Sequence, residues 1–298
     1  MARYPRPIVV VGVDGSPESV AAARWAANEA ALRNHGLQLL CSMYVPVVRY
    51  PMVGYPAEFV EYAKTQARIM LNRVKAEIKV SHPDLEVIAE CTRIEPRTAL
   101  VQASEHVALT VVGSLASGRV QEVMLGSVAL HVSSHCRSPT AVAPYDIDRR
   151  GGPVLVGVDG AAHSEAAAAV AFDEAALRGV GVVAVMAFDG WARQGFARRP
   201  ITFDADESRE EYAVISEQLA GLAQRYPEVP VHEHLLRGHA ADCLVGYTGH
   251  APLEQRPQLI VVGNRGRGGL TGLLLGSTSH TVIAHAACPV VVVRPMES

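Results

Sequence analysis

The sequence predicts two tandem doubly wound α/β domains, and two observations lead to this prediction. First, the chain repeats itself: the segment from Ile8 to Gly15 returns from Val154 to Gly160, and the shift of 145 residues carries Asp14 onto Asp159. Second, short β-branched runs alternate with longer helical patterns in each half, as in right-handed βαβ units. Each half is therefore expected to form a mainly parallel, five-stranded, Rossmann-like sheet.

Length and composition agree with two cytoplasmic domains. The 298 residues suit about two domains, which we expect at 1–146 and 153–298 with a charged, Gly-rich linker at 147–152. A formal charge of −3 gives no reason to expect nucleic acid or an anionic membrane as partner. Neither a signal-peptide pattern nor an apolar stretch of the ~18 residues that a membrane helix needs is visible. The protein is therefore expected in the cytoplasm.

Hydrophobic periodicity places the elements of each half. In the first half we expect strands at 8–13, 37–44, 85–91, 109–113 and 139–143, and helices at 17–33, 58–80, 96–106 and 127–135. In the second half we expect strands at 154–158, 181–187, 230–236, 259–262 and 289–293. Continuous apolar runs such as Val290–Val293 suit strands that are buried on both faces of a parallel sheet.

The first helix of the first half has a clear start signal, because Ser16 can cap it and Pro17 suits its first position. The equivalent segment 161–164 lacks this signal, so its helix is expected to begin later. Asp14 and Asp159 end the first strands, and Gly12 and Gly157 stand two residues earlier. Ligands of such sheets bind beyond the carboxyl ends of the strands. Each aspartate is thus a candidate ligand, with a plain turn carboxylate as the alternative.

Clustered glycines follow the apolar run 259–262. They form the pattern Gly263-x2-Gly266-x9-Gly276-Ser277, with Arg265 inside it. Glycines let the backbone approach an anion, exposed N–H groups and a helix start attract it, and an arginine adds a charged donor. The stretch is therefore interpreted as a phosphate-binding loop. No G-x-x-x-x-G-K-[ST] sequence is present, which argues against a P-loop NTPase.

This glycine spacing resembles that of the ATP-binding members of the universal stress protein family, and the resemblance covers the whole chain. It implies ATP, possibly with Mg²⁺, as the cofactor and a regulatory role in stress or growth arrest. In the family, the aspartate faces the nucleoside and the metal–phosphate region, and the end of the second strand lines the adenine pocket. That strand end falls at Ser42 and Ala187, where Cys41 and Met186 replace the histidine usual in the family. For Ser42 and Ala187, a plain core role is the alternative.

The glycine loop of the first half departs from this pattern, because Leu115 and Ala116 stand where the second half has Arg265 and Gly266. If Gly266 has a positive φ, an alanine there costs roughly 1 kcal/mol or more, so the first site is expected to be the weaker. The serines that begin the last helices could also act as N-caps. The nucleotide-binding candidates are Gly12, Val13, Asp14, Ser42, Gly113, Gly118, Arg119, Gly126, Ser127 and Val128, and Gly157, Val158, Asp159, Ala187, Gly263, Asn264, Arg265, Gly266, Arg267, Gly268, Gly269, Gly276, Ser277 and Thr278.

No catalytic residue and no metal ligand set is predicted. The sequence has no evident base or nucleophile, His232 and His234 lack a third ligand at diagnostic spacing, and the five scattered cysteines favour reduced thiols. A nucleotide-binding regulator is the first hypothesis; a slow Mg-dependent ATP hydrolase and an interaction scaffold without nucleotide are the alternatives. The loops 46–56 and 189–200 could close over a ligand or meet an unknown protein partner. The family also implies pairing through the last strands, hence an internal pseudo-dimer and a possible homodimer.

Overall fold

The computed structural model describes residues 7–44, 57–114, 126–145, 151–188, 207–250, 255–266 and 275–295. The chain divides into two compact units, residues 1–147 and 148–298. The loops 46–56 and 189–200, which could close over a ligand or meet a partner, lie outside the described residues. None of the helices in the described ranges has the length and apolarity that crossing a membrane would need.

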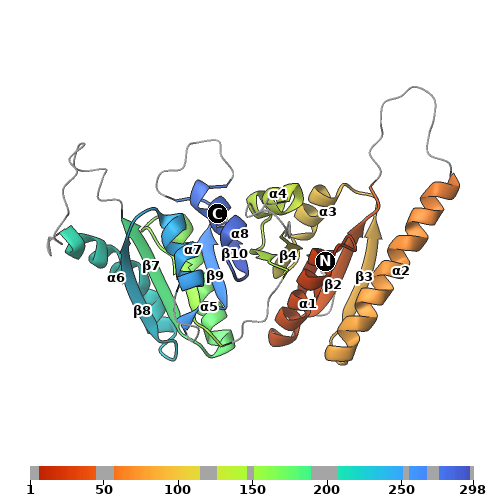
Figure 1. Ribbon diagram of the computed structural model, residues 1–298. Helices are drawn as coiled ribbons and strands as arrows, with labels where there is room; N and C mark the ends of the chain where they lie inside the picture. Colours follow the sequence, from red (N-terminus) through yellow and green to blue (C-terminus); the bar gives the residue numbers. More distant parts are fainter. Residues whose placement is uncertain are drawn as a thin grey trace, which may run out of the picture. The chain divides into compact units, whose positions relative to one another are not determined.

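The first unit alternates strands and helices along the chain, as predicted (Figure 1). Its elements are β1 (Ile8–Gly12), α1 (Pro17–Leu32), β2 (Gly36–Ser42), α2 (Ala57–Ser81), β3 (Val87–Thr92), α3 (Pro96–Ala103), β4 (Leu109–Gly113), α4 (Ser127–His135) and β5 (Thr140–Ala143). All strand pairs are parallel, in the order β3-β2-β1-β4-β5. Because the chain moves outward from β1 and then returns to β4 on its other side, right-handed crossovers put α1 and α2 on one face and α3 and α4 on the other.

The second unit repeats this order. Its elements are β6 (Val154–Gly157), α5 (Ala162–Arg178), β7 (Val182–Phe188), α6 (Glu207–Arg225), β8 (Val231–Arg237), α7 (Ala240–His250), β9 (Leu259–Gly263), α8 (Ser277–His285) and β10 (Val290–Val293). Its strands are also parallel, in the order β8-β7-β6-β9-β10. The predicted fold class, two tandem doubly wound domains with five-stranded parallel sheets, is confirmed.

The core of each unit lies between its sheet and its helices. The central strand β1 is buried along Val9, Val10 and Val11, and the predicted strand Val290–Val293 is buried over its whole length. Helix α1 faces β1 and β4 with alanines such as Ala22. Small side chains let the helix lie close to the sheet, so the first turn of α1 reaches the end of β4.

The two first helices begin at equivalent positions despite their different start signals. Ser16 caps α1 as predicted, with its Oγ accepting a hydrogen bond from Ser19 N at 3.2 Å, and Pro17 follows at the first helical position. Helix α5 begins at Ala162 without a side-chain cap, so the prediction of a later start was wrong. The buried alanine face of α5 fixes its position against the sheet, and tertiary packing supplies most helical stability in proteins.

Candidate functional site

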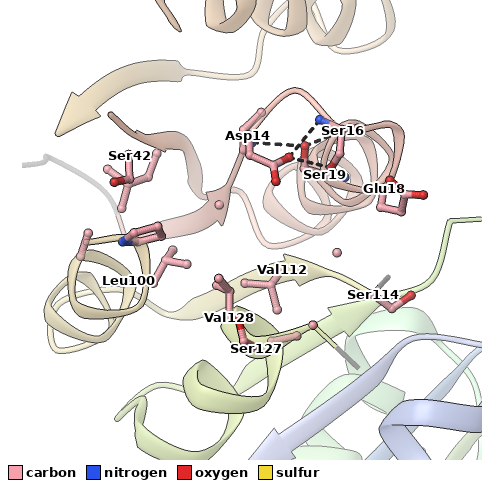
Figure 2. Close-up of a pocket in the computed structure, with 18 residues that line it drawn as sticks. Asp14, Ser16, Glu18, Ser19, Ser42, Leu100, Val112, Ser114, Ser127 and Val128 are labelled. Atoms are coloured by element: carbon pink, nitrogen blue, oxygen red, sulfur yellow. Dashed lines mark hydrogen bonds between the residues drawn. The ribbon is translucent and has the colours of Figure 1, made fainter. Parts of the chain in front are cut away.

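A cavity of about 240 Å³ opens in the first unit at the carboxyl ends of β1 and β4. This is the point where the strand order reverses, as expected for ligand sites in doubly wound sheets. Figure 2 shows Asp14, Ser16 and Ser19 together on one side of the cavity, with Ser42 and Leu100 on another. The lining residues are Gly12, Val13, Asp14, Ser16, Glu18, Ser19, Leu40, Ser42, Pro96, Ala99, Leu100, Val112, Gly113, Ser114, Gly126, Ser127, Val128 and Ala129.

The cavity brings together most of the candidates from the first half. Those that line it are Gly12, Val13, Asp14, Ser42, Gly113, Gly126, Ser127 and Val128. Gly118 and Arg119 lie outside the described residues. The sequence interpretation missed the wall formed by Pro96, Ala99 and Leu100 of α3, which no glycine or charge pattern marks; only the position of α3 opposite β1 reveals it. It also missed Glu18, which the internal repeat could have found by its alignment with His163.

Asp14 is held as a charged carboxylate by the turn that follows β1. Its Oδ1 accepts hydrogen bonds from Ser16 N at 2.9 Å and Ser16 Oγ at 2.6 Å, and its own N–H donates to Ser19 Oγ at 3.3 Å. Partial burial acts to raise the pKa of Asp14, but the hydrogen bonds from Ser16 and Ser19 outweigh it, so the pKa lies below its ordinary value. Asp14 therefore presents a negative charge to the cavity.

Two glycines let helices approach the cavity closely. A Cβ on Gly113 would lie 2.8 Å from the carbonyl oxygen of Glu18, so the first turn of α1 contacts the end of β4 directly. A Cβ on Gly12 would lie 3.1 Å from Leu100 Cδ1 of α3. Gly113 therefore has no room for a side chain, whereas a side chain at Gly12 would require Leu100 to shift slightly. The two helices form walls of the cavity.

The end of β2 supplies a polar group beside an inert thiol. Ser42 Oγ donates to Ile94 O at 2.6 Å and accepts from Tyr44 N at 3.1 Å, which ties the end of β2 to the segment before α3. The neighbouring Cys41 is buried and lies opposite Cys91 of β3 as a free thiol. Burial raises the pKa of Cys41 to about 11, so this thiol stays protonated and is a poor nucleophile.

The aspartate turn of the second unit is tied to helix α6. Asp159 Oδ1 accepts from Ala161 N at 3.0 Å, and Asp159 N donates to Ser164 Oγ at 3.2 Å. Gln218 of α6 accepts from Gly160 N and donates to Ser164 Oγ, both at 2.9 Å. The turn that carries Asp159 is thereby fixed from both sides.

The glycine loop of the second unit is closed by hydrogen bonds between its ends. Gly276 N donates to Asn264 O at 2.7 Å, and Ser279 Oγ donates to Gly263 O at 2.6 Å. These bonds join the end of β9 to the start of α8, and Thr278 lies in the first turn of that helix. Of the other candidates, Gly157 and Ala187 belong to β6 and β7, Val158 follows β6, and Arg267, Gly268 and Gly269 lie outside the described residues.

Gly266 lies in close contact with a side chain, and its backbone conformation does not require glycine. Its φ is outside the positive range, so the cost that we assigned to a positive φ does not apply. A Cβ at Gly266 would lie 2.9 Å from Asp159 Oδ2. The loop therefore meets the carboxylate at the end of the first strand, and a methyl group at Gly266 would require the flexible Asp159 side chain to shift.

The helices that follow the loops begin with open N-termini. The N-cap residues are Gly126 for α4 and Gly276 for α8, and neither helix has a side-chain cap. Ser127 and Ser277 are thus the first helical residues, and the alternative that they act as N-caps is wrong. Beside the α8 start, Arg265 Nε is buried and has no hydrogen-bond partner in the described part of the chain. N–H groups and a guanidinium of this kind are suited to bind an anion.

The described residues contain no cluster of metal-binding side chains. Within them, no group of three or more His, Cys, Asp and Glu side chains is arranged to hold a metal ion. His131 and His135 stack with ring centroids 3.9 Å apart on α4, and His135 Nδ1 hydrogen-bonds to the carbonyl of His131. The arrangement at the strand ends offers a carboxylate, hydroxyls and N–H donors, groups that are able to bind and orient a ligand.

The comparisons with known proteins agree over the whole chain. The sequence matches the universal stress protein family at residues 6–144 and again at 152–294. A universal stress protein of Mycobacterium tuberculosis is 39% identical over 294 residues, 96% of each chain, and one of Mycolicibacterium smegmatis is 37% identical over 294 residues, 96% of this chain and 97% of the relative. The crystal structure of a universal stress protein from Archaeoglobus fulgidus shares the fold, with a TM-score of 0.72, 18% identity and coverage of 98% of this chain and 99% of that one. The chain therefore belongs to the universal stress protein family as a tandem of two domains, and this membership supports a role in the stress response.

Proposed function

We propose that this protein is a nucleotide-dependent regulator of the stress response, and that its second unit binds ATP at the loop 263–277. The observation that supports this most directly is the buried Nε of Arg265, which has no hydrogen-bond partner among the described residues. Buried polar groups are nearly always paired in native proteins, so such an atom favours an anionic ligand at this place.

The surroundings of Arg265 fit the phosphates of a nucleotide. The start of α8 has no side-chain cap, and its first residues Ser277 and Thr278 add hydroxyls to the backbone N–H groups. The positive end of a helix dipole attracts phosphate. The joined ends of the loop, held by Gly276 N and Ser279 Oγ, preorganise these donors.

Asp159 would contact the ribose of the nucleotide or a magnesium ion that accompanies it. Its Oδ1 is engaged by Ala161 N, while Oδ2 points to Gly266 of the loop. A carboxylate in this place can accept hydrogen bonds from ribose hydroxyls or, if Mg²⁺ accompanies the nucleotide, bind the cation. The site offers no evident general base, so binding rather than turnover is the proposed activity.

Calorimetric titration of the full chain with ATP tests the proposal. Arg265→Ala should weaken ATP binding at least about tenfold, because a buried charge-assisted hydrogen bond is lost. Arg225→Ala, at the exposed C-terminal end of α6, is the matched control and should leave the affinity unchanged. ATP binding that does not respond to Arg265→Ala would contradict the proposal, and phosphate release that disappears in Asp159→Ala would replace it with a slow ATPase.

A further inference from the structure

Two cysteines lie side by side at the carboxyl ends of β2 and β3, strands that are neighbours in Figure 1. Cys41 of β2 is the register partner of Cys91 of β3, and both are free thiols. Just beyond them, Met43 N donates to Thr92 O at 2.8 Å, so the strands remain paired past the cysteines. Register partners in a sheet project their side chains to the same face, so the two thiols are neighbours.

The cysteine pair lies on the face of the sheet that points away from the cavity. Leu40 and Ser42 line the cavity, and successive side chains of a strand point to opposite faces, so Cys41 between them points to the other face. Helix α2 packs on that face, and its Arg68 is among the charged groups that act on the pKa of Cys91. The two thiols therefore make up a site of their own, separate from the candidate nucleotide site.

The spacing of the strands permits a bond between the two sulfur atoms. Neighbouring strands lie about 4.8 Å apart, within the Cα separations of roughly 4.4–6.8 Å that disulfides span. Bonded cysteines bring their Cβ atoms to about 3.8 Å from each other, so β3 has to shift slightly toward β2. Among the described strands, β3 pairs with β2 alone, so no second ladder opposes this shift. A disulfide that requires such a shift is more easily reduced than a relaxed one, which makes the bond reversible.

The two thiols differ in their surroundings, which assigns them different roles. Cys91 is half-buried, whereas Cys41 is only 5% exposed. Burial raises the pKa of Cys91, an effect that Arg68 counteracts and Glu90 reinforces. Burial also raises the pKa of Cys41, and a Cys91 thiolate and Asp14 raise it further. Cys91 is therefore the thiol that an oxidant from solvent meets first, and its conversion to a neutral sulfenic acid removes one charge that opposes ionisation of Cys41.

We propose that Cys91 and Cys41 form a reversible disulfide when the protein meets hydrogen peroxide. The Cys91 thiolate attacks one peroxide oxygen and breaks the O–O bond, which gives Cys91 sulfenic acid, and the released hydroxide takes up the thiol proton as water. The Cys41 sulfur then attacks the Cys91 sulfur, the S–O bond breaks, and the departing hydroxide takes the Cys41 proton. Two thiols and one peroxide thus become one disulfide and two waters. The neighbouring position compensates for the weak nucleophilicity of Cys41, because the second step occurs within one molecule.

The second unit provides two contrasts to this pair. At the position of its sheet that is equivalent to the pair, Met186 of β7 is the register partner of Leu235 of β8, so no thiols meet there. Cys243 of α7 resembles Cys91, because it is half-buried and burial raises its pKa, but no thiol is among the groups that shift that pKa. Peroxide can oxidise Cys243 to a sulfenic acid, yet it is expected to stay outside any disulfide.

Peptide mapping of the full chain after mild treatment with hydrogen peroxide tests this inference. Trypsin under non-reducing conditions should release peptide 34–49 joined to peptide 80–93 with the loss of two hydrogen atoms, and dithiothreitol should separate them. Cys41→Ala should abolish the cross-link and let Cys91 sulfenic acid accumulate, which dimedone traps. Cys91→Ala should abolish the cross-link and leave Cys41 unmodified. Cys243→Ala is the matched control and should leave the cross-link unchanged.

Several results would overturn the inference: both cysteines stay reduced under peroxide, Cys91 proceeds to a sulfinic acid without a cross-link, or the cross-link joins other cysteines. A cross-link that forms equally in the chain unfolded by urea would also overturn it, because it would not depend on the register of β2 and β3. Far-UV circular dichroism and thermal unfolding check that each variant is folded, and the mapping of the natural chain decides the matter without any variant. These measurements need no nucleotide, so their outcome is distinct from that of the proposed function.

Discussion

The two units share their backbone contacts and differ in several side chains near them. In both, a glycine at the end of the fourth strand contacts the first turn of the first helix, with Gly113 in one unit and Gly263 in the other. In both, a buried glutamate pairs with an arginine four residues later, Glu29 with Arg33 and Glu174 with Arg178. Glu18, however, is replaced by His163.

The comparison shows which positions of the duplicated chain are constrained by packing and which are not. A strand–helix contact through a glycine leaves no room for a side chain, so both copies must keep it. A side chain that takes no part in this contact, such as that of Glu18 or His163, is less constrained. Substitutions at equivalent positions can therefore test how far the equivalence of the two units goes.

The largest effect is expected where the units are most alike. Gly113→Val and Gly263→Val each place a branched side chain within 3 Å of a backbone carbonyl, and each should lower the free energy of unfolding of its unit by about 3 kcal/mol or more. Chemical denaturation of the full chain, with the two transitions resolved, measures this. A severe loss in one unit with a mild loss in the other would show that the two contacts are not equivalent.

A slightly smaller effect is expected on binding at the second loop. Gly266→Glu fills the 2.9 Å approach to Asp159 Oδ2 and adds a negative charge, so ATP affinity of the second unit should fall about 100-fold. Calorimetry checks this, with Gly221→Glu on the open face of α6 as control. Ala116→Gly should improve ATP binding in the first unit only modestly, because Leu115 still stands where the second unit has Arg265. Two equal ATP sites that neither substitution alters would contradict the comparison.

Much of the fold, and the aspartates of the candidate sites, could be predicted from the sequence because they depend on local patterns. The strands were predicted within a few residues, since β-branched runs such as Val9–Val11 are continuous and buried. The turn residues Asp14 and Asp159 were placed by their position after the first strands. Both predictions depend on local sequence patterns, and the internal repeat shows each pattern twice.

What the sequence could not provide depends on contacts between distant segments. The contribution of Leu100 to the cavity follows from the return of the chain across β1, and nothing in its own neighbourhood indicates it. The contact of Gly266 with the carboxylate of Asp159 joins residues more than one hundred positions apart. Likewise, α5 begins without a cap because packing fixes it, so a rule based on local capping gave the wrong start.

A modest effect is expected from the anchor of the second loop. Ser279 Oγ donates to Gly263 O at 2.6 Å, whereas the equivalent residue of the first unit is Ala129. Ser279→Ala should destabilise the second unit by about 1 kcal/mol and weaken its ATP binding several-fold. Ala129→Ser is the reciprocal change in the first unit. Denaturation and titration of the same variants check both, and an unaltered ATP affinity in Ser279→Ala would show that this bond does not order the loop.

The smallest effect is expected at the helix starts, where a single hydroxyl separates the two units. Ser16→Ala removes the cap of α1 and should cost about 1 kcal/mol at neutral pH, while Ala161→Ser should stabilise α5 by about 0.5–1 kcal/mol.

The loss in Ser16→Ala should also depend on pH, because Ser16 donates to Asp14. Hydrogen bonding holds the pKa of Asp14 below its ordinary 3.8 in the folded protein. Its contribution to stability is therefore present above that value and disappears as pH falls through the lower folded pKa. Ser16→Ala brings the two pKa values closer, so the gap in unfolding free energy between the natural chain and the variant should be widest at neutral pH and narrow below about pH 4. Denaturation at pH 7 and pH 3 measures the gap, and a gap of equal size at both would show that Ser16 acts on the helix alone and not through Asp14.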